Sequence, residues 1–194
     1  MDELSRLPPM AWVLIACAVV FGFALALVWR SYRKYRARKA LRVAVTGAAA
    51  DHIVNGLVPD GMGGSFHVDY LLLTQRAVVV IDLRDVPGNI FGGDQMANWT
   101  VMDGPRRFTF VNPQSELYDR VAAVKAVAGD VPVEGRIVFT HRGRFPKGLP
   151  KWTVMIDGLR AEFPAANFPS PESEARYREA WQRLKNAVKP SYLR

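Results

Sequence analysis

The stretch that decides the fold is VDYLLLTQRAVVVIDLRDVPGNIFG, which runs from Val68 to Gly92. It contains two apolar runs, Leu71–Thr74 and Ala77–Leu83, separated by the polar pair Gln75-Arg76. Short β-branched runs interrupted by polar residues are typical of paired strands, so we expect a tight antiparallel hairpin. The other predicted elements are arranged around this hairpin.

Two carboxylates occupy the predicted hairpin. Asp69 begins the first strand, and Asp82 follows the apolar run Val78–Ile81. An acid in so apolar a strand costs free energy unless it is paired, hydrogen-bonded or bound to a metal. Arg84 lies two residues further on and therefore shares a face of the sheet with Asp82. Two interpretations stay open: a buried Asp–Arg pair that holds the sheet edge, or a divalent-metal site made by Asp69 and Asp82.

With these residues the sequence resembles a NERD (nuclease-related) domain, a family related to the PD-(D/E)XK nuclease group. In the pattern of that family an Asp is followed by a strand and turn, then by Glu-x-Lys, and then by a glycine-spaced segment. The matching residues, in chain order, are Asp69, Asp82, Arg84, Gly88, Ile90, Gly92, Trp99 and the pair Asn112-Pro113. Asp69 stands at the Asp position, Asp82 at the Glu and Arg84 at the Lys. The resemblance covers roughly residues 40–150.

The resemblance implies an α/β fold with a restriction-endonuclease-like core, in which a mixed sheet of five or six strands is flanked by helices. It also implies a nuclease site in which Asp69 and Asp82 hold Mg²⁺ or Mn²⁺. Arg84 would stabilise the charge on the phosphate, in part of the role of the family's lysine.

The chain departs from the family pattern at four positions. Asp82 is shorter than the usual Glu, and Arg84 cannot act as a base because a guanidinium is not deprotonated in proteins. Gly47-Ala48 stands where Gly-Glu is common, and Glu116 stands where the family tends to have Gln. Asp51, one turn beyond Ala48 in the predicted helix, is a candidate substitute for the missing Glu, and Glu116 is a second auxiliary candidate.

The N-terminal part of the chain predicts a membrane anchor. The run from Met10 to Trp29 is apolar throughout, and a membrane-spanning helix needs about 20 such residues. Trp12 and Trp29 lie near its two ends, where aromatic rings favour the membrane interface. The lone cysteine, Cys17, lies inside this run, so no intramolecular disulfide can form.

A basic cluster follows the predicted span. Its seven members are Arg30, Arg33, Lys34, Arg36, Arg38, Lys39 and Arg42. Because Lys and Arg accumulate on the cytoplasmic side, we expect the N-terminus outside and the following domain in the cytosol, as a single-pass membrane protein. Without these seven, 19 basic residues remain against 18 acidic ones, so the formal charge of +8 is mostly this cluster. The high isoelectric point therefore does not by itself indicate nucleic-acid binding.

Periodicity predicts further elements beside the hairpin. A helix is expected over Leu41–Leu57, strands over Trp99–Met102, Arg107–Val111, Gly135–Phe139 and Val154–Ile156, and an amphipathic helix over Glu172–Val188. Asn112 and Pro113 are typical of the first positions of another helix. The predicted organisation is a short segment at 1–9, the span at 10–29, the basic segment at 30–42, a NERD-like domain at 43–160, and a proline-rich segment with the last helix at 161–194.

A basic loop with an aromatic residue follows the strand at Gly135–Phe139. Arg142, Arg144 and Lys147 surround Phe145 there, and such a mixture suits contacts to phosphates and bases, with a solvated loop as the alternative. His67 would share a face with Asp69.

Three functions stay open: a metal-dependent nuclease, a degenerate nuclease domain that binds nucleic acid without cutting it, and a protein-interaction domain at the membrane. The expected partners are accordingly the lipid bilayer, DNA or RNA, and other proteins.

Overall fold

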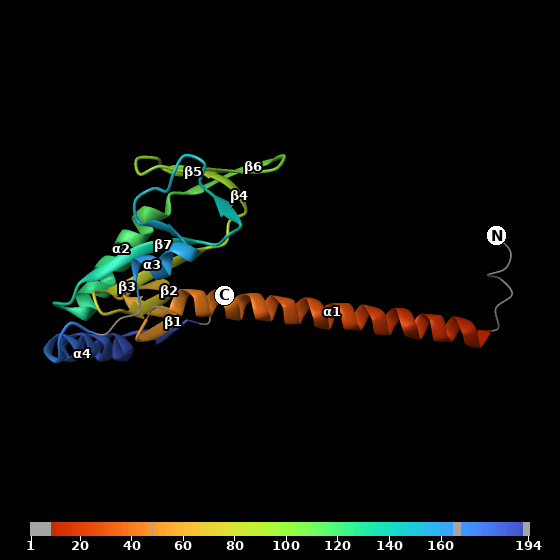
Figure 1. Cartoon of the computed structure of the whole chain (residues 1–194), viewed down its shortest axis with the longest axis horizontal. Coiled ribbons are helices and arrows are strands. Elements are labelled where there is room, and N and C mark those ends of the chain that lie inside the picture. Colours follow the sequence, from red (N-terminus) through yellow and green to blue (C-terminus); the bar gives the residue numbers. More distant parts are fainter. Residues whose placement is uncertain (1–8, 48, 165–167, 192–194) are drawn as a thin grey trace. The chain divides into compact units, whose positions relative to one another are not determined.

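The computed structural model describes residues 9–47, 49–164 and 168–191, and within the first helix the side chains of residues 9, 11–18 and 34 lie outside the description (Figure 1). The chain divides into two compact units, residues 1–43 and 44–194. Ala48 and part of the proline-rich passage, residues 165–167, are outside the described residues.

A single long helix, α1 (Pro9–Thr46), accounts for the described part of the first unit. Within it the Arg33 guanidinium lies over the Trp29 ring, 5.1 Å from the centroid. Among the described residues, no helical segment has the length and hydropathy required to cross a membrane. The predicted span at 10–29 includes residues 11–18, among them Trp12 and Cys17, whose side chains lie outside the described part of the chain.

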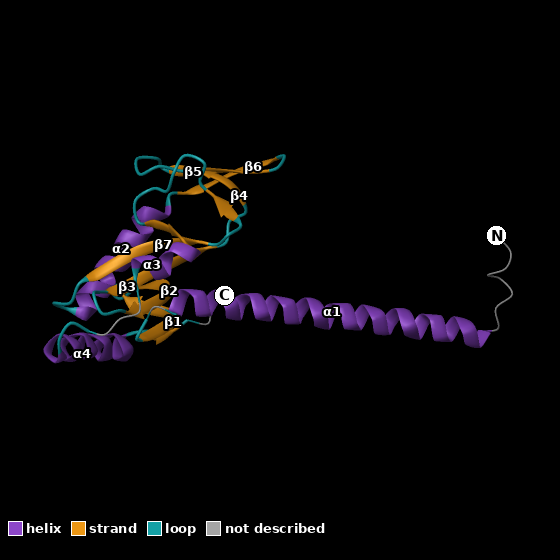
Figure 2. Ribbon diagram, viewed as in Figure 1, coloured by secondary structure: helices purple, strands orange, loops and turns teal. Residues whose placement is uncertain are grey.

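The second unit is an α/β structure built on a mixed main sheet of six strands (Figure 2). In spatial order these are β10 (Lys189–Pro190), β1 (Asp51–Pro59), β2 (Ser65–Leu73), β3 (Val78–Arg84), β7 (Val133–Phe139) and β9 (Thr153–Met155). The strands β10, β1, β2 and β3 pair antiparallel, whereas β3, β7 and β9 are parallel. The predicted hairpin is confirmed as β2 and β3, with Leu71 opposite Val80.

Four other strands form a separate small sheet. In spatial order they are β6 (Arg106–Val111), β5 (Asn98–Asp103), β4 (Gly88–Phe91) and β8 (Gly143–Arg144). The strands predicted at Trp99–Met102 and Arg107–Val111 are confirmed as β5 and β6, which pair antiparallel and belong to this small sheet, not to the main one. Gly88 has a φ of 97° and a Cβ there would meet the Met102 carbonyl, so glycine is needed where the chain leaves the main sheet.

Helix α2 (Pro113–Ala128) packs on the main sheet as the sequence predicts. The Asn112 side chain accepts a hydrogen bond from the Gln114 N–H at 3.0 Å, and Pro113 is the first helical residue. Gly135 of β7 lets the helix approach closely, because a Cβ there would collide with Leu117 and Val121. The remaining helices are α3 (Ile156–Glu162), which was not predicted, and α4 (Pro171–Ala187), which confirms the predicted C-terminal helix.

The predicted helix over Leu41–Leu57 is wrong in its second half. Helix α1 ends at Thr46, and β1 begins at Asp51. The apolar positions that suggested a helical stripe include Ile53 and Val54, whose β-branched side chains suit a strand as well. Ile53 lies opposite Leu71 in the ladder with β2, so non-local pairing decides the structure of this segment.

Candidate functional site

Asp82 is the buried centre of a charged cluster at the end of β3. The residue is only 4% exposed. Its Oδ2 accepts a hydrogen bond from Arg84 Nη2 at 2.8 Å and another from Arg120 Nη1 at 3.1 Å. Glu116 bridges the same two arginines, at 3.4 Å from Arg84 and 3.1 Å from Arg120. The predicted Asp82–Arg84 pair is therefore present, and a second arginine completes it.

Strand and helix periodicity bring these four side chains together. Alternation along β3 places Asp82 and Arg84 on the same face as Val80, which belongs to the core that α2 covers. Glu116 and Arg120 are four residues apart on α2 and so lie one above the other on the helix surface. Because α2 packs on this face of the sheet, its first turns meet the end of β3.

Asp69 reaches the same place from the neighbouring strand. The register that puts Tyr70 opposite Ile81 puts Asp69 opposite Asp82. The Asp69 Oδ2 accepts a hydrogen bond from the Leu83 N–H at 2.8 Å. Burial raises the pKa of the Asp69 carboxyl, and the negative charge of Asp82 adds to this rise, whereas the Leu83 hydrogen bond opposes it. The two predicted carboxylates are thus electrostatically coupled.

The backbone is unusual beside Asp69. Asn55, which the β1–β2 register places opposite Asp69, has a φ of 51°, and the two residues do not pair. A positive φ in a non-glycine residue inside a strand costs free energy and often accompanies functional sites. Asp69 therefore lies at an interruption of the ladder, where its carboxylate can take the place of a backbone acceptor for the Leu83 N–H.

Two buried nitrogen atoms near the cluster have no hydrogen-bond partner among the described residues. They are His67 Nε2 and Arg84 Nε. The other ring nitrogen of His67, Nδ1, lies 3.7 Å from Asp69 Oδ1. Buried polar nitrogens are normally satisfied, so two unsatisfied ones on residues that contact Asp69 and Asp82 indicate a site with unused hydrogen-bonding capacity.

The cluster carries more negative than positive charge. Asp69, Asp82 and Glu116 supply three carboxylates against the guanidinium groups of Arg84 and Arg120. Burial alone would lower the pKa of Arg84, but the hydrogen bond and charge of Asp82 raise it above its usual value, so Arg84 stays charged. The unbalanced charge belongs to Asp69, which makes only a backbone hydrogen bond and the long His67 contact.

The chemistry of these donors suits a hard divalent cation, because Mg²⁺ is commonly held by one or two carboxylates together with water. Both carboxylates make their hydrogen bonds through Oδ2, and no hydrogen bond reaches the Oδ1 atom of Asp82 from the described residues. Among those residues no three His, Cys, Asp or Glu side chains are grouped as metal ligands. Asp69 and Asp82 therefore fit a two-carboxylate site, not a larger protein cage.

The other predicted residues lie apart from this cluster. Arg142 pairs with Asp85 at 2.8 Å, and Arg142 and Arg144 line a polar hollow of about 390 Å³ beside the small sheet. Lys147 is exposed and does not line this hollow. Glu116, in contrast, does reach the Asp82 cluster, as expected for an auxiliary residue.

Asp51 makes its side-chain contacts with α4 and not with the Asp82 cluster. Its Oδ2 accepts hydrogen bonds from Trp181 Nε1 at 2.9 Å and Lys185 Nζ at 2.6 Å, which attaches α4 to β1. Burial raises the pKa of Asp51, but the hydrogen bonds from Lys185, Trp181 and the His52 N–H lower it by more. The prediction failed because it assumed that Asp51 lies on a helix.

Arg120 is the site residue that the sequence analysis missed. The sequence contains a signal for it, because Glu116 and Arg120 have the four-residue spacing of a helical ion pair.

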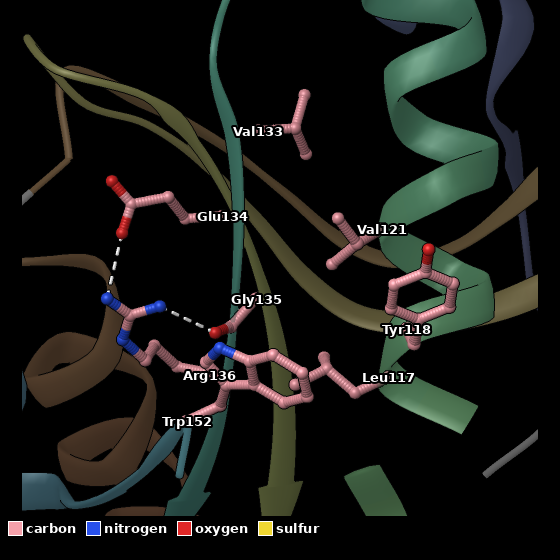
Figure 3. Close-up of a pocket in the computed structure, with 8 residues that line it drawn as sticks. All are labelled: Leu117, Tyr118, Val121, Val133, Glu134, Gly135, Arg136 and Trp152. Carbon is pink, nitrogen blue, oxygen red and sulfur yellow. Dashed lines mark hydrogen bonds and ion pairs between the residues drawn. The ribbon is translucent and has the colours of Figure 1, made fainter. Parts of the chain in front are cut away.

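A second hollow, of about 350 Å³, lies between α2 and β7 (Figure 3). Tyr118 and Trp152 line it over an apolar floor that includes Leu117, and neither Asp69 nor Asp82 contributes to it.

Comparison with known families decides the relationship. The model of the nuclease-related domain, NERD, matches residues 32–140, which is more than half of the chain. The chain belongs to the NERD family. The five charged residues of the cluster around Asp82 lie inside the matched range: Asp69, Asp82, Arg84, Glu116 and Arg120. No curated protein and no solved structure matches the chain.

Proposed function

We propose that this NERD protein acts on the phosphodiester backbone of nucleic acid at Asp69 and Asp82. The observation that carries the proposal is that two electrostatically coupled carboxylates from neighbouring strands lie beside two arginines, inside the matched range. Carboxylates with guanidinium groups at hydrogen-bonding distance can hold a cation and a phosphate side by side.

Asp69 and Asp82 would hold Mg²⁺ or Mn²⁺, which, when bound, supplies an activated water and neutralises developing charge on the phosphate. Arg84 is permanently charged, so it binds and orients a phosphate oxygen but takes no proton. Arg120 holds Asp82 from the α2 side and fixes its orientation, and Glu116 aligns both guanidinium groups.

A second function is favoured by one specific observation: the Oδ2 of Asp82 is already held by both arginines. In that arrangement Arg84 and Arg120 neutralise the carboxylate without a metal. The domain would then be a degenerate nuclease that binds nucleic acid and does not hydrolyse it.

The location is a further part of the proposal: the domain is held at the cytoplasmic face of a membrane by residues 10–29. Its support is the sequence, which has twenty residues without a charge followed by seven basic ones. Each basic residue near an anionic lipid surface contributes about 1 kcal/mol. Retention of the full-length chain in membranes after alkaline carbonate extraction would test the anchor, and release into the supernatant would contradict it.

Cleavage by the full-length chain in detergent micelles tests the leading function. Plasmid, single-stranded DNA and RNA are incubated with Mg²⁺ or Mn²⁺. Asp69→Asn is the test variant, because it keeps an acceptor for the Leu83 N–H, and Asp119→Asn removes an exposed carboxylate of α2 as the matched control. We expect cleavage to fall at least about 100-fold in Asp69→Asn and to be unchanged in Asp119→Asn.

The remaining outcomes separate the two functions. A folded wild-type chain that binds nucleic acid but cleaves none with either metal would replace the nuclease by the binding module. Absence of both binding and cleavage would exclude both functions and favour an interaction with other proteins.

A further inference from the structure

The small sheet has one buried and one open face. Ile90, Trp99 and Val101 are buried on the inner face, where Trp99 stacks on Phe139 of the main sheet. Side chains alternate along strands, so the neighbouring residues point the other way. The residues of this outer face are Asn89, Phe91, Thr100, Met102, Arg107, Thr109, Val111 and Arg144, and all of them are exposed or half-exposed.

Strand register arranges two arginines at the ends of one row across the outer face. Asn89 lies opposite Arg144 on one side and Met102 on the other, and Met102 lies opposite Arg107. The row therefore reads Arg144, Asn89, Met102, Arg107 over four strands. Three strand spacings separate the two arginines, which is about 14 Å.

Both of these arginines are unpaired in the part of the chain that the structure describes. Neither Arg107 nor Arg144 has an ion-pair partner there, in contrast to Arg142, which binds Asp85. The described strand residues of the outer face include no acidic side chain. The outer face is therefore a positively charged surface whose charge is free to meet an anion.

A second row supplies groups that suit bases. Phe91 lies opposite Thr100, and Thr100 lies opposite Thr109. An aromatic ring at the end of a row of hydroxyl side chains on an open sheet can stack an unpaired base, while the hydroxyl groups hydrogen-bond its edge. The polar hollow lined by Arg142 and Arg144 adjoins the first row, because Asn89 and Met102 line it too.

We propose that the outer face of the small sheet binds a single-stranded segment of nucleic acid, with phosphates on Arg107 and Arg144 and a base on Phe91. This inference rests on the proposed function. It adds that the nucleic acid on which the Asp69–Asp82 site acts is single-stranded and is bound by the outer face. Only three residues separate Arg84, at the end of β3, from the start of β4. A duplex keeps its bases stacked inside and cannot use Phe91 in this way.

Binding of the full-length chain in detergent micelles to ~12-nucleotide fluorescent DNA and RNA single strands tests the proposal by anisotropy. The double variant Arg107→Ala/Arg144→Ala is compared with Lys125→Ala/Arg160→Ala, which removes the same charge from α2 and α3. We expect Arg107→Ala/Arg144→Ala to bind at least about tenfold more weakly at about 0.15 M salt. The negative slope of log K against log salt should become shallower by about 1.4, because two phosphate contacts are lost. The control should change neither.

Phe91→Ala should weaken binding about fivefold or more without changing the salt slope, because stacking involves no counterion release. Equal losses in the two double variants would overturn the proposal, as would a duplex that competes as well as a single strand. If the affinities for the DNA and RNA single strands differ, the tighter one identifies the preferred nucleic acid. The proposal then requires that the Arg107→Ala/Arg144→Ala variant lose affinity for that preferred nucleic acid.

The test also separates this inference from the proposed function. Asp69→Asn should lower cleavage at least about 100-fold and leave oligonucleotide binding, measured without a divalent metal, unchanged. If the wild type binds through Arg107 and Arg144 but never cleaves, the proposed hydrolysis is contradicted and the proposed binding surface is supported. If the wild type cleaves and the Arg107→Ala/Arg144→Ala variant binds as tightly as the control, the proposed binding surface is contradicted and the proposed hydrolysis is supported.

Discussion

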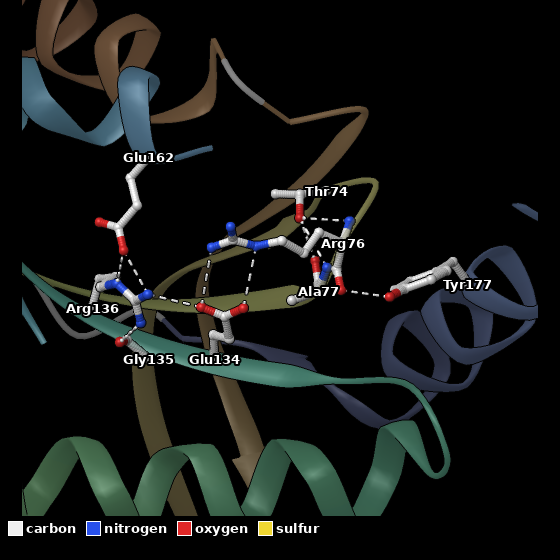
Figure 4. A network of polar contacts seen from close by, with 8 residues as sticks. All are labelled: Thr74, Arg76, Ala77, Glu134, Gly135, Arg136, Glu162 and Tyr177. Atoms are coloured by element: carbon white, nitrogen blue, oxygen red, sulfur yellow. Dashed lines mark hydrogen bonds and ion pairs between the residues drawn. The ribbon is translucent and has the colours of Figure 1, made fainter. Parts of the chain in front are cut away.

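Two clusters of acids and arginines flank the main sheet, and they differ in charge balance. In the one that we call the Arg136 clamp, Arg136 binds Glu134 at 2.8 Å and Glu162 at 2.6 Å, and Arg76 binds Glu134 at 3.4 Å (Figure 4). Both guanidinium groups lie over the Phe163 ring, at 5.0 and 5.3 Å from its centroid. Two acids thus meet two arginines, with no charge left over.

The cluster around Asp82 contains a third carboxylate. Asp69 adds an unbalanced charge whose pKa is raised by burial. Of the three acids only Asp82, at 4% exposure, is more deeply buried than the acids of the clamp, which are about one-third exposed. Similar residues therefore serve different ends: a charge-balanced network stabilises the fold, and an unbalanced network with a buried acid at its centre can attract a cation or a substrate.

The largest effect on stability is expected from Asp82→Ala. The change removes the buried carboxylate that Arg84 and Arg120 share and leaves them only the exposed Glu116 as a common partner. Removing one partner of a buried pair costs several kcal/mol, and since Arg84 keeps 30% exposure we expect about 3 kcal/mol. Urea unfolding of the full-length chain in micelles measures the loss, with Asp119→Ala as control. A loss below about 1 kcal/mol would mean that the cluster behaves like an exposed ion pair.

A smaller loss is expected from Arg136→Ala in the clamp. The variant gives up two ion pairs and a cation–π contact, but Glu134 and Glu162 stay in contact with water. We expect about 1–2 kcal/mol in urea unfolding. Binding and cleavage of nucleic acid by the folded fraction should not change, and a change in either would show that the clamp is not purely structural.

The smallest effect is a pH dependence from Asp69. Its folded pKa lies above the ordinary value of 3.8, so the folded state binds the proton more tightly than the unfolded one. The contribution of Asp69 to stability is therefore fully present below pH 3.8 and is lost as pH rises through the folded pKa. Asp69→Asn should consequently be more stable than the wild type at neutral pH, and the gain should disappear below about pH 4.

Asp51→Asn provides the control with the opposite sign. The pKa of Asp51 is lowered on folding, so its contribution is present above 3.8 and is lost as pH falls through the folded pKa. This variant should be less stable than the wild type at neutral pH and equal to it in acid. Chemical unfolding from pH 3 to pH 7 measures both differences, and two differences of the same sign would contradict the assignment of Asp69.

The sequence predicted those elements in which local pattern and tertiary structure agree. The β2–β3 hairpin follows from two apolar runs and a polar turn, and the start of α2 follows from Asn112 and Pro113. Asp82 and Arg84 could be placed together because strand alternation determines which side chains share a face, whereas Asp69 was joined to them through the family resemblance.

What the sequence analysis missed depends on contacts that no local pattern contains. The apolar spacing of residues 51–59 suits a helix or a strand, and only pairing with β2 and β10 decides for β1. The incorrect helix predicted over this segment also placed Asp51 on a helix, whereas it begins β1. Arg120 joins the site because α2 packs over β3, and the small sheet forms because Gly88 lets the chain leave the main sheet.

The central claim is that Asp69 and Asp82 together hold a divalent cation. Electron paramagnetic resonance of Mn²⁺ titrated into the full-length chain measures this directly, with Asp69→Asn as the test and Asp119→Asn as the control. The account predicts one bound Mn²⁺ in the wild type and the control, and at least about tenfold weaker binding in Asp69→Asn. Equal binding in all three proteins, or none in a folded wild type, would contradict it.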